Sequence, residues 1–365
     1  MQDLGASRDL IAFGEGLLGL LDRGSFVATY KYAVLIGLMD LCIEGTDRHG
    51  VAPTTVTTHQ LAQKVTELYW PHTAAFRGRT LRQNAGSQAR IVADIVRFRL
   101  SLRDPSVRLD LARQQAPRRF LRLVRAVERT LIVMPLPRLQ VMGRLSERLI
   151  YDIGWGVEID CQRGAIREYL ETGLGFDNQI RFLPAVGDHL VRLNGLLRPL
   201  IYRAWAGMVA QLNGLDESRL ERFLFGADRT RLAALRPDLH GLQDGRCFYC
   251  GEKLTERSEV DHFIPWARYP DNGIENLVVA DQRCNGSKRD FLAGVEHVRR
   301  WRSRNSGHAD ALAASAESRA WERHPAETLG VARGLYLRVA AGSPLWTARD
   351  TFGPASPSDL HAALD

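Results

Sequence analysis

Apolar residues recur at helical spacing over the first part of the chain. Residues 8–22 carry an amphipathic pattern, and residues 27–43 are apolar on almost every face. A further helical pattern covers 59–70, directly after Thr57 and Thr58, which are residue types suited to cap a helix. A plain helical bundle explains these helices, and so does the beginning of a helix-turn-helix.

Helical patterns continue over 79–100 and from Pro117, because proline is favoured at the first position of a helix. On the helix that begins at Pro117, four arginines share a face separate from the apolar one: Arg118, Arg122, Arg125 and Arg129. This stripe fits contact with a phosphate backbone. It fits the solvated face of a surface helix equally well.

Glycines punctuate residues 150–194, and the short apolar runs between them predict a few strands or a hairpin. Helical patterns return over 196–240. The predicted fold class is therefore mainly α with a small α+β module. We expect three regions: a mostly helical N-terminal region over 1–240 with a short β-rich insertion near 150–194, a compact module over 241–300, and a helical C-terminal extension over 301–365.

Composition narrows the choice of partners. The chain has 365 residues, of which 45% are apolar and 25% charged, as is typical of a soluble protein with two or three domains. No apolar run approaches the roughly 18 residues of a membrane span, and the N-terminus does not resemble a signal peptide. We therefore expect a cytoplasmic protein, and its formal charge of +7 favours an anionic partner such as nucleic acid.

Three of the five cysteines gather in one segment. Cys247 and Cys250 form a CxxC turn before Gly251, and Cys284 follows. Thiolates at this spacing in a chain without a secretion signal indicate a structural zinc ion rather than disulfides. A tetrahedral site needs a fourth ligand, for which Asp281 lies where a second knuckle would have one; a histidine is the alternative.

The same segment carries groups suited to hydrolysis. Asp261 and His262 lie on a predicted strand, residues 276–280 form a second strand, and Asn285 begins a helix that extends to about Arg300. A carboxylate and an amide oxygen suit a hard divalent cation. An imidazole with an ordinary pKa of about 6.5 is a competent base near neutral pH. The pattern therefore predicts a compact ββα unit with a metal and a base.

This segment resembles the HNH family of ββα-metal nucleases over residues 247–290. The resemblance rests on a combined spacing of ten residues: Cys247, Cys250, Asp261, His262, Pro265, Asn276, Leu277, Cys284, Asn285 and Lys288. Residues 29–41 and 68–92 are also similar to segments of stand-alone bacterial HNH proteins with a helical N-terminal region.

The resemblance implies a role for each matching residue. His262 is the general base that deprotonates the attacking water, and Asp261 and Asn285 hold one divalent cation, Mg²⁺ or Mn²⁺. Asn276 braces the loop by hydrogen bonds rather than touching the substrate. Asp281 stands where zinc-bearing members often have cysteine.

The predicted activity is metal-dependent hydrolysis of DNA phosphodiester bonds, in phage defence, restriction or mobile-element biology. Lys288 and Arg289 are expected to contact the nucleic acid. The N-terminal region is expected to grip duplex DNA, a partner protein or a second copy of the chain. Two alternatives stay open: a catalytically silent, zinc-stabilised DNA-binding protein, against which the intact His262 argues, and an RNA-directed nuclease.

Overall fold

The computed structural model describes residues 2–23, 28–86, 88–142, 145–146, 148–161, 163–226 and 232–365. The chain divides into two compact units. The first unit consists of Met1–Cys42 and Pro53–Gly226, and the second consists of Ile43–Ala52 and Ala227–Asp365. In the described residues, no helix combines the length and the apolar character needed to cross a membrane.

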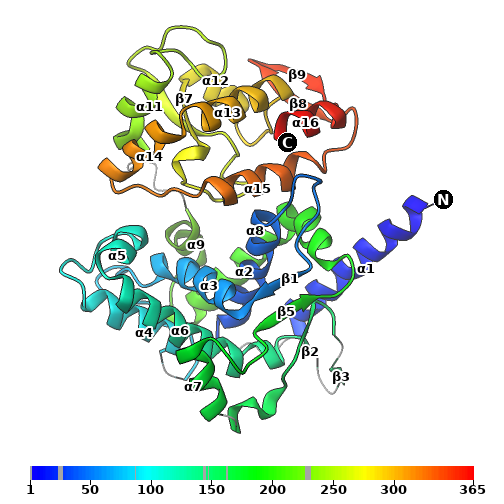
Figure 1. Ribbon diagram of the computed structural model, residues 1–365, viewed down its shortest axis with the longest axis vertical. Coiled ribbons are helices and arrows are strands. Elements are labelled where there is room, and N and C mark those ends of the chain that lie inside the picture. Colours follow the sequence, from blue (N-terminus) through cyan, green and yellow to red (C-terminus); the bar gives the residue numbers. More distant parts are fainter. Residues whose placement is uncertain are drawn as a thin grey trace. The chain divides into compact units, whose positions relative to one another are not determined.

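Helices dominate the first unit (Figure 1). In chain order its elements are α1 (Gln2–Arg23), α2 (Tyr30–Glu44), β1 (Thr55–Thr57), α3 (Thr58–His72), α4 (Arg90–Leu100), α5 (Leu109–Gln115), α6 (Pro117–Val133), η1 (Leu136–Arg138), β2 (Val141–Met142), β3 (Leu145–Ser146), β4 (Tyr151–Ile153), η2 (Val157–Cys161), α7 (Arg163–Thr172), β5 (Gln179–Phe182), α8 (Val186–Asn213) and α9 (Glu217–Phe225). The η elements are short 3-10 helices.

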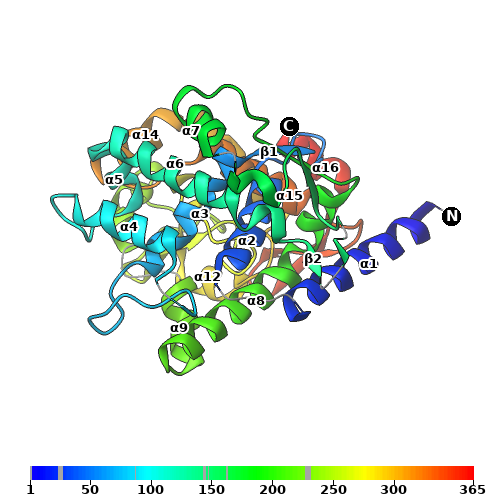
Figure 2. The same cartoon turned by 90° about the horizontal axis from the view of Figure 1, so that it is seen from below.

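Helix α2 lies at the centre of the first unit because its side chains are apolar on nearly every face (Figure 2). Tyr32 stacks on Trp205 of α8, with ring centroids 6.4 Å apart. Gly37 approaches α3 so closely that a Cβ would meet a methyl of Leu61 at 2.9 Å. The predicted helices of this region are therefore present, and they pack around the most apolar of them.

The strands of the first unit cover less of the chain than the sequence predicts. A three-stranded antiparallel sheet has the order β1-β5-β4. However, the apolar residues over 157–161 form a 3-10 helix, and residues 189–193 belong to α8. The reason is packing: Leu190, Asn194, Leu197 and Ile201 are all buried, so the helical period continues through residues 189–193, one of the short apolar runs between the glycines.

Helix α4 is shorter than the predicted helix over 79–100, since residues 79–86 and 88–89 are not helical. In that stretch Gln88 donates to the carbonyl of Leu81 and accepts from the backbone N–H of Gln83. The carbonyl of Gln83 in turn accepts from Thr29. Side-chain and long-range partners thus take the place of helical hydrogen bonds.

The second unit mixes short strands with helices. In chain order its elements are η3 (Ala233–Leu235), α11 (Arg236–Leu242), β6 (Ser258–His262), η4 (Ile274–Asn276), β7 (Leu277–Asp281), α12 (Gln282–Lys288), α13 (Val295–Gly307), α14 (Ala309–Ser318), α15 (Pro325–Tyr336), β8 (Pro344–Ala348), β9 (Thr351–Pro354) and α16 (Pro357–Leu364). The C-terminal extension is helical as predicted, except for the hairpin of β8 and β9.

Helix α13 packs against the start of β7 and the residue that follows β6 through large buried side chains. Trp301 stacks on Phe263, with ring centroids 5.0 Å apart and an interplanar angle of 6°. Its indole N–H donates to the carbonyl of Glu275 at 2.7 Å. The buried guanidinium of Arg304 donates to the same carbonyl and to that of Leu277. These contacts satisfy backbone groups beside β7 and fix the strand that faces the candidate site.

The predicted helix from Asn285 to about Arg300 is divided into α12 and α13. Arg289 ends α12 with a positive φ of 48°. The backbone N–H of Gly294 donates to the carbonyl of Trp346 at 2.7 Å, and Ala293 forms a bridge with the same residue. Pairing with the C-terminal hairpin, which the local sequence does not reveal, interrupts the helix.

Candidate active site

The predicted ββα unit is present. Strands β6 and β7 are antiparallel, so that Asp261 lies opposite Val278 and His262 lies opposite Leu277. Helix α12 follows β7 without a loop, because Asp281 ends the strand and its side chain caps the helix by accepting from the N–H of Arg283. The unit therefore brings the end of β6 beside α12.

Lys288 is the link between the strand and the helix. Its side chain is 0% exposed, and its ammonium donates to the carbonyl of His262 at 2.8 Å and lies 3.1 Å from a carboxylate oxygen of Asp261. This position differs from the predicted phosphate contact. The fully buried ammonium instead neutralises Asp261 and holds the end of β6 against α12, since a buried charge requires a partner.

Asp261 has a second partner, which comes from the cysteine turn. The phenol of Tyr249 donates to Asp261 Oδ2 at 2.6 Å, on the same oxygen that Lys288 approaches. Tyr249 is itself buried, with its ring against those of His297 and Trp346. Two donors thus fix the carboxylate through one oxygen.

Asn285 and Glu259 form a second polar pair on the unit. The amide Nδ2 of Asn285 donates to Glu259 Oε2 at 2.7 Å. Residues two apart on a strand share a face, so Glu259 and Asp261 both lie on the face of β6 toward α12. With its Nδ2 bonded to Glu259, the amide of Asn285 keeps its oxygen as an acceptor.

His262 is nearly buried at the end of β6, with 8% of its surface exposed. Its Nε2 lies 3.0 Å from the side-chain oxygen of Asn272, and its ring lies 5.2 Å from that of Trp266. Burial lowers the pKa of His262 below 6.5, although the hydrogen bond to Asn272 opposes this. The imidazole is therefore neutral near pH 7, which is the form a general base requires.

Asn276 braces the loop after β6. Its side-chain oxygen accepts from the N–H of Ile264 at 2.7 Å, and its Nδ2 donates to the carbonyls of Ile264 and Asp271 at 3.1 and 3.0 Å. The side chain is fully buried. These three bonds are the contacts that the predicted bracing role of Asn276 requires.

The three predicted zinc ligands come together. The sulfurs of Cys247, Cys250 and Cys284 all lie within 4.8 Å of one another, so all three are near enough to serve as ligands of one ion. Burial and the neighbouring thiols raise the pKa of Cys284. Because clustered thiols resist ionisation without a cation, this arrangement fits a zinc ion.

Asp281 has a different role from the predicted fourth ligand. Its carboxylate caps α12, and its backbone N–H donates to the sulfur of Cys247 at 3.3 Å. In the part of the chain that the structure describes, no carboxylate joins the group of three sulfurs. Asp281 therefore supports the cysteine cluster through its backbone rather than through its side chain.

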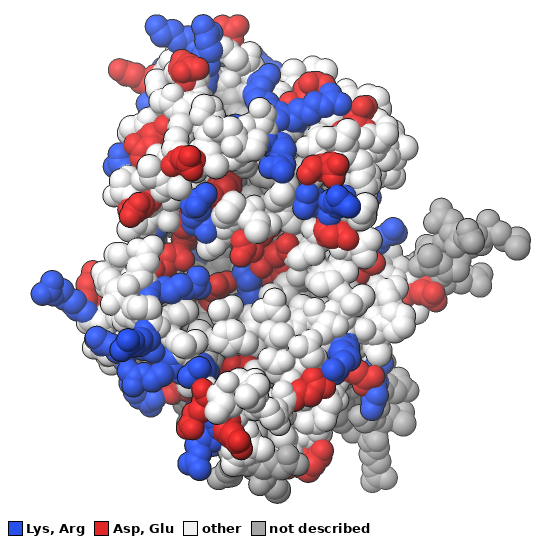
Figure 3. Space-filling model, in the orientation of Figure 1, with Lys and Arg blue, Asp and Glu red and all other residues white. Residues whose placement is uncertain are grey.

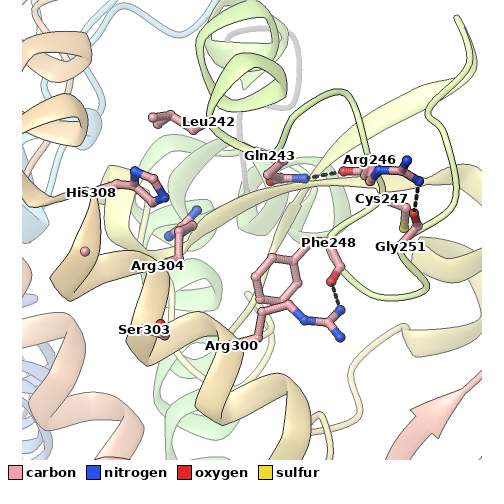
Figure 4. Close-up of a pocket in the computed structure, with 11 residues that line it drawn as sticks. Leu242, Gln243, Arg246, Cys247, Phe248, Gly251, Arg300, Ser303, Arg304 and His308 are labelled. Carbon is pink, nitrogen blue, oxygen red and sulfur yellow. Dashed lines mark hydrogen bonds between the residues drawn. The ribbon is translucent and has the colours of Figure 1, made fainter.

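A cavity of about 430 Å³ adjoins the cysteine turn (Figure 4). The basic residues Arg246, Arg300, Arg304 and His308 line it, and no acidic residue does so. Arg246 donates to the carbonyl of Gly251, and Arg300 donates to that of Tyr249 at 2.9 Å. None of the predicted catalytic residues lines this cavity, so it is separate from the end of β6.

The other candidate nucleic-acid residues are arginines on both units. Arg289 is exposed directly after α12. On α6 of the first unit, Arg118 and Arg122 are exposed, whereas Arg125 and Arg129 are half-buried. Figure 3 also shows Lys and Arg side chains gathered where Figure 1 places α4 and α5. The predicted contact between the α6 stripe and DNA stays a prediction.

Comparison with known proteins agrees with this geometry. A model of the HNH endonuclease family matches residues 247–293. These residues form an HNH endonuclease domain. The CRISPR-associated endonuclease Cas9 of Streptococcus mutans serotype c (strain ATCC 700610 / UA159) is 32% identical over 105 residues, which cover 26% of this chain and 8% of that protein. The chain thus spans a small part of this relative's length, and no solved structure gives a significant match.

The HNH domain contains three polar residues at the site that the sequence prediction missed. Tyr249 lies inside the CxxC turn, Glu259 is two residues before Asp261 on the strand, and Asn272 belongs to an Asp-Asn-Gly turn. The sequence does contain a signal for Glu259. Side chains alternate between the two faces of a strand, so Glu259 lies on the same face of β6 as Asp261. Tyr249 and Asn272 depend on contacts between distant segments, which local patterns do not predict.

The oxygen atoms on this face fit a hard divalent cation. Asp261 is bonded through Oδ2 and retains Oδ1, and Asn285 retains its amide oxygen. Carboxylate and amide oxygens are typical ligands of Mg²⁺ and Mn²⁺. The donor set of the HNH domain therefore agrees with a catalytic cation, and the three thiols agree with a separate zinc ion.

The capping role of Asp281 makes a testable prediction. Asp281→Asn preserves the cap of α12 and should change the free energy of unfolding by less than about 0.5 kcal/mol, whereas Asp281→Ala should lower it by about 1 kcal/mol. Both variants should retain one zinc ion per chain, measured by metal analysis of purified protein. Loss of zinc from Asp281→Asn would instead identify the carboxylate as the fourth ligand.

The buried pair of Lys288 and Asp261 predicts a strong effect on stability. Lys288→Met leaves the carboxylate buried without its cation, so the second unit should lose about 3–5 kcal/mol of unfolding free energy. The matched double variant Lys288→Met/Asp261→Asn removes both charges and should be less destabilised than the two single effects combined, by about 1 kcal/mol or more. Hydrogen exchange of the amides of β6 and β7 measures both effects, and strict additivity would contradict the pairing.

Proposed function

We propose that this protein is a metal-dependent HNH endonuclease that hydrolyses DNA phosphodiester bonds. The observation that carries the proposal is the ββα unit, which places His262 at the end of β6 next to Asp261 in the chain and brings α12, with Asn285, against the same strand. A base and hard oxygen donors at one strand end are the groups that metal-assisted hydrolysis of a phosphodiester needs.

His262 is proposed to accept the proton of the attacking water. Its low exposure and lowered pKa favour the neutral imidazole at physiological pH. Asp261 and Asn285 would hold Mg²⁺ or Mn²⁺, which when bound polarises the phosphoryl group and stabilises the leaving oxygen. Lys288 and Tyr249 hold the Asp261 carboxylate in its orientation through one oxygen.

Two observations support DNA as the substrate: the match to the HNH endonuclease family and the positive charge of the chain. The HNH domain is an endonuclease domain, and the chain carries a formal charge of +7, which favours a polyanion. The exposed Arg289 beside α12 is a candidate phosphate contact near the site. A role in phage defence or restriction is part of the same proposal, and the similarity to a CRISPR-associated endonuclease supports it.

Cleavage of plasmid DNA tests the proposal. Purified protein with Mg²⁺ or Mn²⁺ should nick or linearise supercoiled plasmid, and removal of divalent ions by EDTA should abolish cleavage. His262→Ala should lower the rate by about 10²- to 10⁴-fold, because loss of a general base costs that much. Single-stranded DNA and RNA assayed in parallel separate a DNA nuclease from an RNA-directed one.

The control is Trp266→Phe, which keeps an aromatic ring beside His262 and adds or removes no ionisable group. This variant should cleave within a few-fold of the wild-type rate. Equal cleavage by the wild-type protein and His262→Ala would contradict the catalytic assignment. Metal-dependent DNA binding without cleavage by the wild-type protein would favour a catalytically silent DNA-binding protein instead.

A further inference from the structure

The loop between β6 and β7 places an amide directly on the imidazole of His262. The side-chain oxygen of Asn272 lies 3.0 Å from His262 Nε2. An amide oxygen is an acceptor only, so the imidazole nitrogen that faces it carries the proton. The other nitrogen, Nδ1, then holds the lone pair that a general base needs.

The backbone around Asn272 is held by several independent bonds. Asp271 accepts from the N–H of Gly273 through Oδ1 and from the hydroxyl of Thr328 through Oδ2, both at 2.7 Å. The carbonyl of Asn272 accepts from the indole N–H of Trp321 at 2.7 Å. The loop therefore presents the Asn272 side chain from a fixed backbone.

Two of these donors come from the C-terminal extension, outside residues 247–293. Trp321 lies in the connection between α14 and α15, and Thr328 lies on α15. The same connection contacts the end of the loop, because the carbonyl of Glu322 accepts from the N–H of Ile274 at 3.0 Å. The extension thus contributes to the geometry at His262, although none of its residues is a candidate for the chemistry.

We propose that Asn272 is a positioning residue, which fixes the proton of His262 on Nε2 and leaves Nδ1 as the basic atom, and that Trp321 and Thr328 of the C-terminal extension hold it in place. The inference rests on the proposed function for its catalytic meaning. Its structural content, the hydrogen-bonded Nε2–H, does not depend on nuclease activity. We expect loss of this partner to lower activity by about 10- to 100-fold, by analogy with the hydrogen-bond partners that orient metal-ligating histidines.

Imidazole-selective ¹⁵N–¹H NMR of the zinc-loaded protein without added Mg²⁺ or Mn²⁺ tests the hydrogen bond directly. The wild-type spectrum should contain a slowly exchanging Nε2–H signal that disappears in His262→Ala. Asn272→Leu has a similar branched shape and no acceptor, so it should lose this signal, while Asn272→Asp keeps an acceptor and should retain it. Persistence of the signal in Asn272→Leu, or a His262 proton on Nδ1, would overturn the inference.

Measurements of kcat and KM distinguish a positioning role of Asn272 from a general loss of structure. At pH 8.5, Asn272→Leu should lower kcat by about 10- to 100-fold with KM and the affinity for Mn²⁺ unchanged, and Asn272→Asp should restore most of the lost rate. Trp321→Phe keeps the ring but removes the N–H bonded to Asn272, so it should lower kcat by a smaller factor. An unchanged kcat in Asn272→Leu would contradict the positioning role.

Asn305→Asp is the matched control, because it makes the same amide-to-carboxylate change in the same unit. Its side-chain oxygen pairs with Arg304 rather than with His262, and kcat should stay within about twofold. If the wild-type protein lacks nuclease activity, the proposed function fails, whereas the NMR signal still decides whether Asn272 fixes the imidazole.

Discussion

The ammonium of Lys288 is completely buried and bonds to both the carbonyl of His262 and the carboxylate of Asp261. The buried charge is tolerated because both partners are present. Removing either the ammonium or the carboxylate would lower the free energy of unfolding by about 3–5 kcal/mol. The bond therefore ties α12 to the end of β6, where the base and the predicted metal ligand lie side by side in the chain. The phenol of Tyr249 completes the arrangement on the same carboxylate oxygen.

This arrangement connects the cysteine cluster to the catalytic face. Tyr249 lies between Cys247 and Cys250, and Cys284 is on the same helix as Asn285 and Lys288. A zinc ion at the three thiols would hold the turn and the helix together, since small modules commonly need such a metal. The structural and the catalytic parts of the HNH domain consequently depend on the same short helix and the same turn.

The sequence was sufficient to predict the ββα unit, the three clustered cysteines and the bracing by Asn276, because each depends on spacing within one short segment. The sequence was not sufficient to predict the contacts of Lys288 or of Asp281. A lysine near a catalytic motif suggests phosphate contact, but Lys288 is buried and forms an ion pair with Asp261. The carboxylate of Asp281 caps the N-terminus of α12. Asn272 was read only as a turn residue, since its position depends on Trp321 and Thr328, about 50 residues later in the chain.

The proposed hydrolysis requires one hard cation on the face of β6 toward α12, separate from the zinc site. Anomalous diffraction from crystals of the protein soaked in Mn²⁺ measures this directly, because the metal is located independently of the protein atoms. We predict a single manganese peak between the free oxygens of Asp261 and Asn285, with zinc at the three cysteines. Saturating Mn²⁺ that binds only at the cysteines, or nowhere on this face of β6, would contradict the account.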